Sequence, residues 1–344
     1  MSQDKALTEK KLSALWNNKT IKEIDTRGKR IVMFSDMHLG DGGKADDFRH
    51  NHMAFGRALD FYLKENYTVI LLGDIEEFWQ FDSERVFKEY DSTVYNKFRA
   101  FKEGFFYRVH GNHDSEWGTP RDPARSIVGK SEVASEALKL RDKDGEARIL
   151  LVHGHQGDEE SDKHSWSSRF FVRLYKIIEP IIKIDRLASA TKCQITKGYE
   201  RILYTWAKSS KVMLICGHSH RAIFRSISYI ERLEEDVVRL EKEIRDIGED
   251  KELLEKKRNE LKKKRAEIKD EKKKNREITP VETEGETLPC YFNTGCALYP
   301  SGITAIEIDH DEMRLVEWSR DNEKKETPEI FDRDSLSDFI KKIV

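Results

Sequence analysis

The sequence predicts an α/β fold that carries its chemical groups at strand ends, and two features support this prediction. Five short apolar runs of strand length each end in polar residues, and the stretches between them are long enough for helices. Such runs suit strands that are buried on both faces, and ligands bind at the carboxyl ends of strands in such sheets. The five runs are 31–34, 68–72, 105–109, 149–152 and 212–216.

The composition excludes several classes of protein. The chain has 344 residues, 38% hydrophobic and 37% charged, and its 62 basic and 64 acidic residues nearly cancel. A net charge of -2 does not favour nucleic acid or membrane as a partner of the whole chain. The four cysteines (Cys193, Cys216, Cys290 and Cys296) form no C-x-x-C pair, and no segment is apolar enough to be a signal peptide or to span a membrane. We therefore expect a soluble, cytoplasmic protein.

Helices are expected between the strands, at 55–65 and 199–208. The segment 156–210 is too apolar for a solvent-facing loop, and Pro180 is expected to divide it into two pieces. It is predicted to be helical and either packs on the core or forms a lid over the site.

A heptad pattern begins after the fifth motif. Apolar residues recur at spacings of three and four up to Gly248, and a second run with a seven-residue spacing continues to about residue 274. The heptad positions are Ile230, Leu233, Val237, Leu240, Ile244 and Ile247, then Leu254, Leu261 and Ile268. An antiparallel helical hairpin over 229–277 is predicted, inserted into a domain formed by 1–228 and 278–344.

The hairpin has three interpretations. It is a solvated coiled coil, or its seam pairs with a second protomer or a protein partner. Contact with nucleic acid is less favoured, because the run KKKRAEIKDEKKK lacks aromatic residues and alternates with acids. Beyond the hairpin, two further strands are expected at 289–297 and 302–308, and a short helix from Ser335.

The polar residues at the strand ends have the chemistry of metal ligands. In an extended SDMHLGD segment, Asp36 and His38 would point the same way, and Asp74 follows Gly73 at a strand tip. A carboxylate can bridge two metals through its two oxygens. The later motifs supply Asn112, His113 and Asp114 (GNHD), His153 and His155 (HGH), and His218 and His220 (GHSH).

The order D-x-H, G-D, G-N-H-D, H-G-H and G-H-S-H resembles the calcineurin-like metallophosphoesterases. The resemblance implies a four-layer α/β/β/α sandwich with two divalent cations. It implies that Asp36, His38 and His220 bind one cation, that Asn112, His153 and His218 bind the other, and that Asp74 bridges them. His113 would then stabilise the transition state or protonate the leaving oxygen, with Asp114 beside it as a second catalytic candidate. His155 competes with His153 as a ligand or contacts the substrate.

The expected reaction is hydrolysis of a phosphodiester, phosphomonoester or pyrophosphate by a metal-activated hydroxide. The ligands favour Mn, with Fe and Zn as alternatives. GDIEEFW and the helical insertion are similar to the subgroup that includes UDP-2,3-diacylglucosamine pyrophosphatase, whose third motif has Arg where this sequence has His113. The alternatives are such a pyrophosphatase, a nuclease that acts with a partner through the hairpin, and a metal-bearing scaffold without activity.

Overall fold

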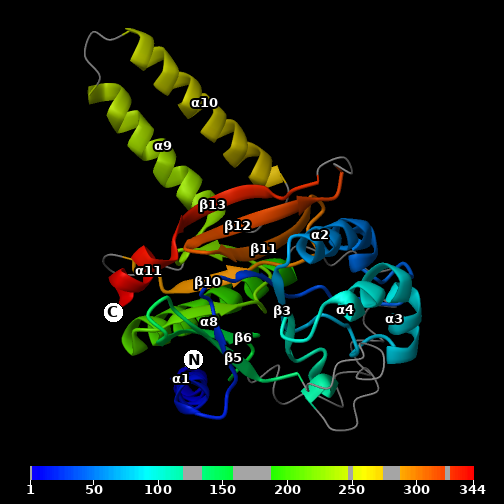
Figure 1. The fold of residues 1–344 in the computed structure, drawn as a ribbon. Coiled ribbons are helices and arrows are strands. Elements are labelled where there is room, and N and C mark those ends of the chain that lie inside the picture. Colours follow the sequence, from blue (N-terminus) through cyan, green and yellow to red (C-terminus); the bar gives the residue numbers. More distant parts are fainter. Residues whose placement is uncertain (1, 119–133, 158–186, 247–250, 274–286, 322–325) are drawn as a thin grey trace.

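Two β-sheets form the centre of the protein, which we describe from a computed structural model (Figure 1). The structure describes residues 2–118, 134–157, 187–246, 251–273, 287–321 and 326–344. One sheet has seven strands in the order β1-β5-β6-β7-β10-β8-β9, and the other has six in the order β13-β12-β11-β2-β3-β4. The predicted α/β fold with two packed sheets is confirmed.

The strands are β1 (Glu23–Asp25), β2 (Arg30–Phe34), β3 (Thr68–Leu72), β4 (Phe106–Val109), β5 (Ala137–Arg141), β6 (Ala147–Val152), β7 (Met213–Cys216), β8 (Ala222–Phe224), β9 (Ile227–Ser228), β10 (Tyr291–Thr294), β11 (Gly302–Asp309), β12 (Glu312–Ser319) and β13 (Glu329–Ser335). The helices are α1 (Ser2–Asn17), α2 (His52–Lys64), α3 (Ser83–Tyr90), α4 (Asn96–Ala100), α8 (Leu187–Ser210), α9 (Tyr229–Asp246), α10 (Lys251–Lys273) and α11 (Leu336–Ile343).

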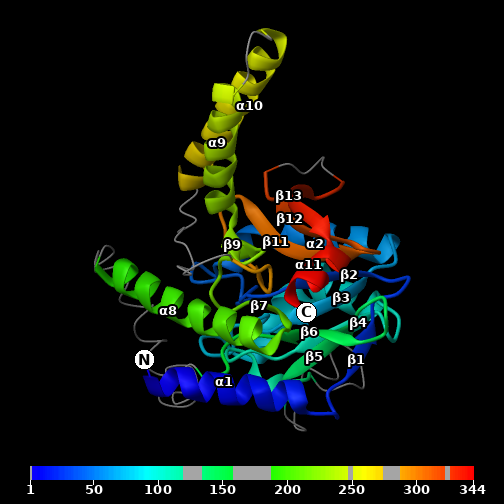
Figure 2. The same ribbon diagram turned by 90° about the vertical axis from the view of Figure 1, so that its left-hand side faces the viewer.

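The alternation of side chains along β2 explains the layers. Ile31 and Met33 point into the core between the two sheets, whereas Val32 and Phe34 point into a second core under α2, α3 and α4. Helices α1 and α8 lie side by side on the outer face of the other sheet, where Trp206 donates a hydrogen bond to Ser13 at 2.9 Å (Figure 2). Helices therefore cover both outer faces of the two-sheet sandwich.

All five predicted strands are present, each within two residues of its expected start. They are divided between the sheets, because β2, β3 and β4 pair in parallel in one sheet and β6 and β7 in the other. Their carboxyl ends nevertheless meet at one edge of the sandwich, where the motifs lie. The part of the segment 156–210 that was predicted to divide at Pro180 falls outside the described residues, and the remainder from 187 onward is α8.

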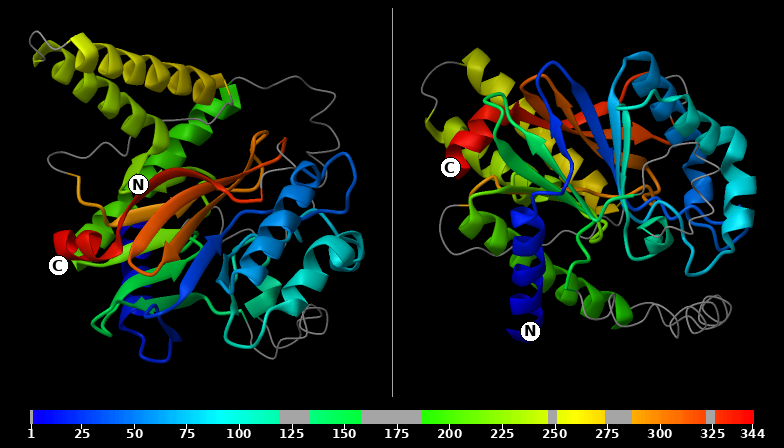
Figure 3. Two further views of the ribbon diagram at one scale, coloured as in Figure 1. Left: turned by 45° about the horizontal axis from the view of Figure 1, so that its top comes forward. Right: turned by 60° about the horizontal axis from the view of Figure 1, so that its bottom comes forward.

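Helices α9 and α10 lie side by side and project from the sandwich (Figure 3). They run antiparallel, since Lys257 pairs with Glu243 whereas Lys264, one heptad further along α10, pairs with Asp236, one heptad earlier in α9. None of the described helices is both long and apolar enough to cross a bilayer. The chain boundaries of the hairpin as a separate domain stay a prediction.

Candidate metal centre

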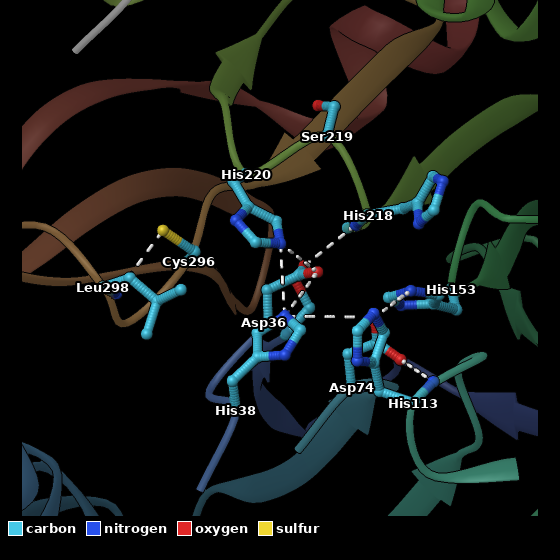
Figure 4. A network of polar contacts seen from close by, with 12 residues as sticks. Asp36, His38, Asp74, His113, His153, His218, Ser219, His220, Cys296 and Leu298 are labelled. Carbon is cyan, nitrogen blue, oxygen red and sulfur yellow. Dashed lines mark hydrogen bonds and ion pairs between the residues drawn. The ribbon is translucent and has the colours of Figure 1, made fainter. Parts of the chain in front are cut away.

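Side chains from five strand ends meet at one edge of the sandwich (Figure 4). The described acidic and histidine residues contain three groups whose ligand atoms lie within 4.8 Å of one another. The groups are Asp36, His38 and His220; Asp74, His153 and His218; and His38, Glu77 and His113. The first two groups consist entirely of residues that the sequence singled out.

The loop backbone at these residues is not extended. Asp36 and His38 have φ values of 52° and 51°, and Asp74, His218 and His220 are also left-handed. The expectation that an extended D-x-H segment aligns two side chains is therefore wrong, although the two side chains do converge. Non-glycine residues in this conformation are uncommon and gather at functional sites, where the surrounding structure holds them in place.

The first group has its ligand atoms close together. His220 Nε2 lies 3.2 Å from Asp36 Oδ1 and 3.2 Å from His38 Nε2, and His38 Nε2 lies 3.9 Å from Asp36 Oδ1. The other oxygen, Asp36 Oδ2, accepts hydrogen bonds from the Ser35 hydroxyl and from the backbone N–H of His218, the latter at 2.9 Å. These bonds orient the carboxylate and leave Oδ1 to face the two imidazoles.

Asp74 lies between the two groups. Its Oδ2 is 3.0 Å from His153 Nε2 in the second group and 3.9 Å from His38 Nε2 in the first. Nδ1 of His153 lies 2.8 Å from the carbonyl oxygen of Leu72, which directs Nε2 towards Asp74. One carboxylate oxygen thus faces ligand atoms of both groups.

Three buried polar atoms of the site accept or donate no hydrogen bond within the described part of the chain. They are Asp36 Oδ1, Asn112 Oδ1 and His153 Nε2. Asp36 Oδ1 and His153 Nε2 have ion-pair contacts with His220 and Asp74 but no hydrogen bond, and a buried polar atom without a hydrogen bond costs about 1–3 kcal/mol. A cation beside Asp36 and another beside His153 would give these two atoms a partner, and the oxygen and imidazole donors match the preferences of Mn, Fe and Zn. The residues present therefore fit two divalent cations.

Neighbouring opposite charges shift the pKa values of these residues. Burial alone would raise the pKa of Asp74, but His153 holds it well below its usual value, and His220 lowers that of Asp36 in the same way. Burial disfavours the charged imidazole of His153, but Asp74 outweighs this effect and raises its pKa to about 10. Glu77 likewise raises the pKa of His38 to about 9 against the effect of burial.

His113 is held by contacts on three sides. Its Nδ1 lies 2.8 Å from one oxygen of Glu77, whose other oxygen lies 2.8 Å from Nδ1 of His38. The indole of Trp79 stacks on the ring with centroids 4.0 Å apart and planes at 22°, and the ring of His38 meets it edge-on at 4.8 Å. These contacts fix the ring and leave Nε2 as the nitrogen that can reach a substrate.

Asp114 occupies a different position from His113. It is fully buried, and its two oxygens accept hydrogen bonds from the backbone N–H groups of Ile75 at 2.8 Å and Gly111 at 2.6 Å. Arg108, which also pairs with the buried Glu76 at 2.6 Å, lies 3.4 Å from the same carboxylate. Asp114 thus holds the GNHD turn in place and does not face the ligand groups.

His155 lies beside the second group without joining it. Its ring is 5.3 Å from that of His153 and 6.4 Å from that of His218, and its Nδ1 is buried without a hydrogen-bond partner among the described residues. Asn112 is buried as well, with 8% of its surface exposed.

Sequence reasoning missed Glu77 and Asn293. Glu77 was visible as an acid three residues after Asp74 in GDIEEFW, but nothing in the sequence showed that it joins two histidines. Asn293, in FNTG of β10, donates hydrogen bonds to the Gly217 carbonyl at 2.5 Å and to the Ser219 hydroxyl at 3.0 Å, and so supports the GHSH loop. Its contacts span more than 70 residues of sequence, which no local pattern reveals.

The family model for calcineurin-like phosphoesterases matches residues 29–222, which include every residue of the three ligand groups. The search of curated proteins found no match.

Proposed function

Because this chain belongs to the calcineurin-like phosphoesterase family, whose members hydrolyse phosphate esters, we propose that it is a hydrolase with a dinuclear metal centre. One cation is assigned to Asp36, His38 and His220, and the other to Asn112, His153 and His218. Asp74 bridges the two. The position of Asp74 Oδ2 between His153 and His38 carries this proposal, since one oxygen faces both ligand groups.

The cations, when bound, supply a hydroxide nucleophile at neutral pH and neutralise charge on the phosphoryl oxygens. His113 contributes its Nε2, which can donate a proton to the leaving oxygen or a hydrogen bond to the phosphoryl group. Glu77, which is 4% exposed, orients His113 through Nδ1 and supports His38 in the same way. Asp114 has a positioning role, because its carboxylate holds the turn that presents Asn112 and His113.

Manganese is the proposed metal, with iron and zinc as alternatives, because the donors are imidazole, carboxylate and amide groups without a thiolate. The three cysteines that the structure describes as free are buried, and none belongs to the ligand groups. The class of ester is left open between phosphodiester, phosphomonoester and pyrophosphate, since no described contact distinguishes them.

The test is to strip the protein with a chelator and reload it with Mn²⁺, Fe²⁺ or Zn²⁺. Elemental analysis then gives the number of bound cations, and aryl phosphodiester, aryl phosphomonoester and nucleotide-sugar substrates give the activity. Two cations per chain together with metal-dependent hydrolysis are expected. A single cation, or hydrolysis that persists without metal, would overturn the dinuclear proposal.

The chain offers a matched control for the ligand assignment. His220 and His310 both have a φ of 58°, but His310 is an exposed residue paired with Asp309, outside the ligand groups. Asparagine tolerates this conformation, so neither substitution strains the backbone. His220→Asn is expected to release one cation, and His310→Asn to keep both.

A further inference from the structure

Helix α10 divides its cations between two faces. One set faces α9 and is neutralised by acids of that helix in three ion pairs. The pairs join Lys257 to Glu243 at 2.7 Å, Lys264 to Asp236 at 3.3 Å, and Arg265 to Glu241 at 2.7 Å. Three acids of α9 thus neutralise three cations of α10 between the helices.

A second set of cations lies on what we call the outer face of α10. All five are exposed, and none forms an ion pair or side-chain hydrogen bond with a side chain that the structure describes. They are Lys256, Arg258, Lys262, Lys263 and Lys269. At 1.5 Å per residue they extend over about 20 Å of helix. Among the α10 side chains that the structure describes, Glu255 is the only exposed acid.

The outer face lacks the apolar surface that other occupants would need. Of the large hydrophobic side chains described in the two helices, only Val238 and Leu253 are exposed, at 65% and 41%, while Leu240 is buried. A second copy of the chain would need an apolar seam, and a membrane surface would need an apolar face to insert. Exposed cations in a row without such a face match a phosphate backbone.

The base of the hairpin lies beside the metal centre. Strand β8 begins at Ala222, two residues after His220, and β9 folds back along it so that Ser228 pairs with Ile223. Helix α9 begins at the next residue, Tyr229, close to the edge of the sheet where His220 lies. The hairpin therefore leaves the sandwich close to the ligand groups.

We propose that the outer face of α10 binds the phosphate backbone of a nucleic acid. If the bound nucleic acid is also the substrate, the substrate class is a polymeric phosphodiester. That part of the proposal rests on the proposed function. The binding step itself depends only on the five cations.

The test measures binding of a fluorescent single-stranded oligonucleotide by anisotropy over a series of salt concentrations. Five phosphate contacts predict a slope of log K against log salt of about −3.5, at about 0.7 for each contact. Lys262→Gln/Lys263→Gln/Lys269→Gln removes three contacts and should reduce the slope to about −1.4, with at least a tenfold loss of affinity at low salt. The control Lys102→Gln/Lys143→Gln/Lys342→Gln removes the same charge from exposed lysines outside the hairpin and should bind like the wild type.

Three results would overturn the proposal: salt-independent or absent binding by the wild-type chain, equal losses in the two triple variants, or tighter binding to anionic vesicles than to the oligonucleotide. Far-ultraviolet circular dichroism checks that the variant helices remain folded. Hydrolysis of the aryl phosphodiester should be unchanged in both variants. If oligonucleotide binding fails while this hydrolysis remains, only the docking proposal is lost, whereas absence of hydrolysis in every variant tells against the proposed function.

Discussion

The carboxylate of Asp74 accepts a hydrogen bond from the backbone N–H of His113 at 2.8 Å. This bond uses Oδ1, whereas Oδ2 faces His153 and His38. The residue proposed to bridge two cations therefore also fixes the loop that carries the proposed proton donor. A change at Asp74 should thus affect metal binding and the position of His113 together.

Asp74→Ala is expected to lower metal affinity by more than about 100-fold and to abolish hydrolysis, because it removes the bridge and the acceptor for His113. Asp74→Asn keeps an acceptor oxygen for the backbone N–H but loses the bridging charge. It should therefore bind at most one cation while retaining a nearly native melting temperature. Isothermal titration with Mn²⁺ distinguishes the two variants, and retained activity in either one contradicts the bridging role.

His113→Ala should keep both cations and lose about 10²- to 10⁴-fold in kcat, the usual contribution of a positioned acid. Glu77→Gln, in contrast, disturbs both His113 and His38. It is expected to lower kcat and also to lower the affinity for one cation by about 10- to 100-fold. Loss of a carboxylate that is hydrogen-bonded to a metal-binding histidine has an effect of this size. Elemental analysis beside steady-state kinetics checks both effects, and unchanged metal binding in Glu77→Gln would mean that its contact with His38 is dispensable.

Metal binding should release protons and strengthen as pH rises. In the metal-free protein the pKa values of His38 and His153 are raised to about 9 and 10, so both imidazoles are protonated at pH 7 and each cation must displace a proton. The protonated forms of His38 and His153 stabilise the metal-free fold. This contribution is fully present below about pH 6.5 and is lost as the pH rises towards 9 and 10. Titrations in buffers of different ionisation enthalpy measure the released protons, and thermal denaturation with chelator measures the stability. Metal binding without proton release at pH 7 would contradict the prediction.

Gly111 cannot be replaced by a larger residue without moving Asp74. A Cβ at this position would clash with Asp74 Oδ1 and would lie 2.5 Å from the Asp74 backbone nitrogen. Gly111→Ala is therefore expected to lower metal content and activity together. Gly198→Ala is the control, since nothing lies within 4 Å of the place that an alanine Cβ would take. Alanine also favours the helix by about 1 kcal/mol relative to glycine. Equal behaviour of the two variants would count against this packing argument.

Arg108 contacts residues that support the site. It is buried, pairs with Glu76 and Asp114, and stacks on Trp117 at 3.7 Å. Arg108→Met should destabilise the fold by about 3–5 kcal/mol, because it leaves buried carboxylates without their counter-charge. Adding Glu76→Gln should recover part of this loss. Urea denaturation measures both variants, and a loss below about 1 kcal/mol for Arg108→Met would show that the carboxylates find other partners.

Local pattern predicted much of the fold. The five strands were found because continuous apolar runs of four or five residues have few alternatives when polar motifs end them. Helix α11 follows Ser335, which accepts a hydrogen bond from Asp338 N–H as an N-cap should. The pattern could not show that β2 and β6 belong to different sheets, nor could it find β12, whose register depends on its pairing with β11.

The sequence by itself indicated which residues could carry the chemistry, since aspartate, asparagine and histidine at five strand ends have side chains that can bind a cation. Only the tertiary structure decided their geometry: the left-handed backbone at Asp36 and His38, the place of Asp74 between two groups, and the role of Asp114 in the turn. It also revealed the contacts of Glu77 and the exposed cations of α10. The reason is physical, because ligand identity is a property of single side chains, whereas distance, burial and pairing depend on residues far apart in the chain.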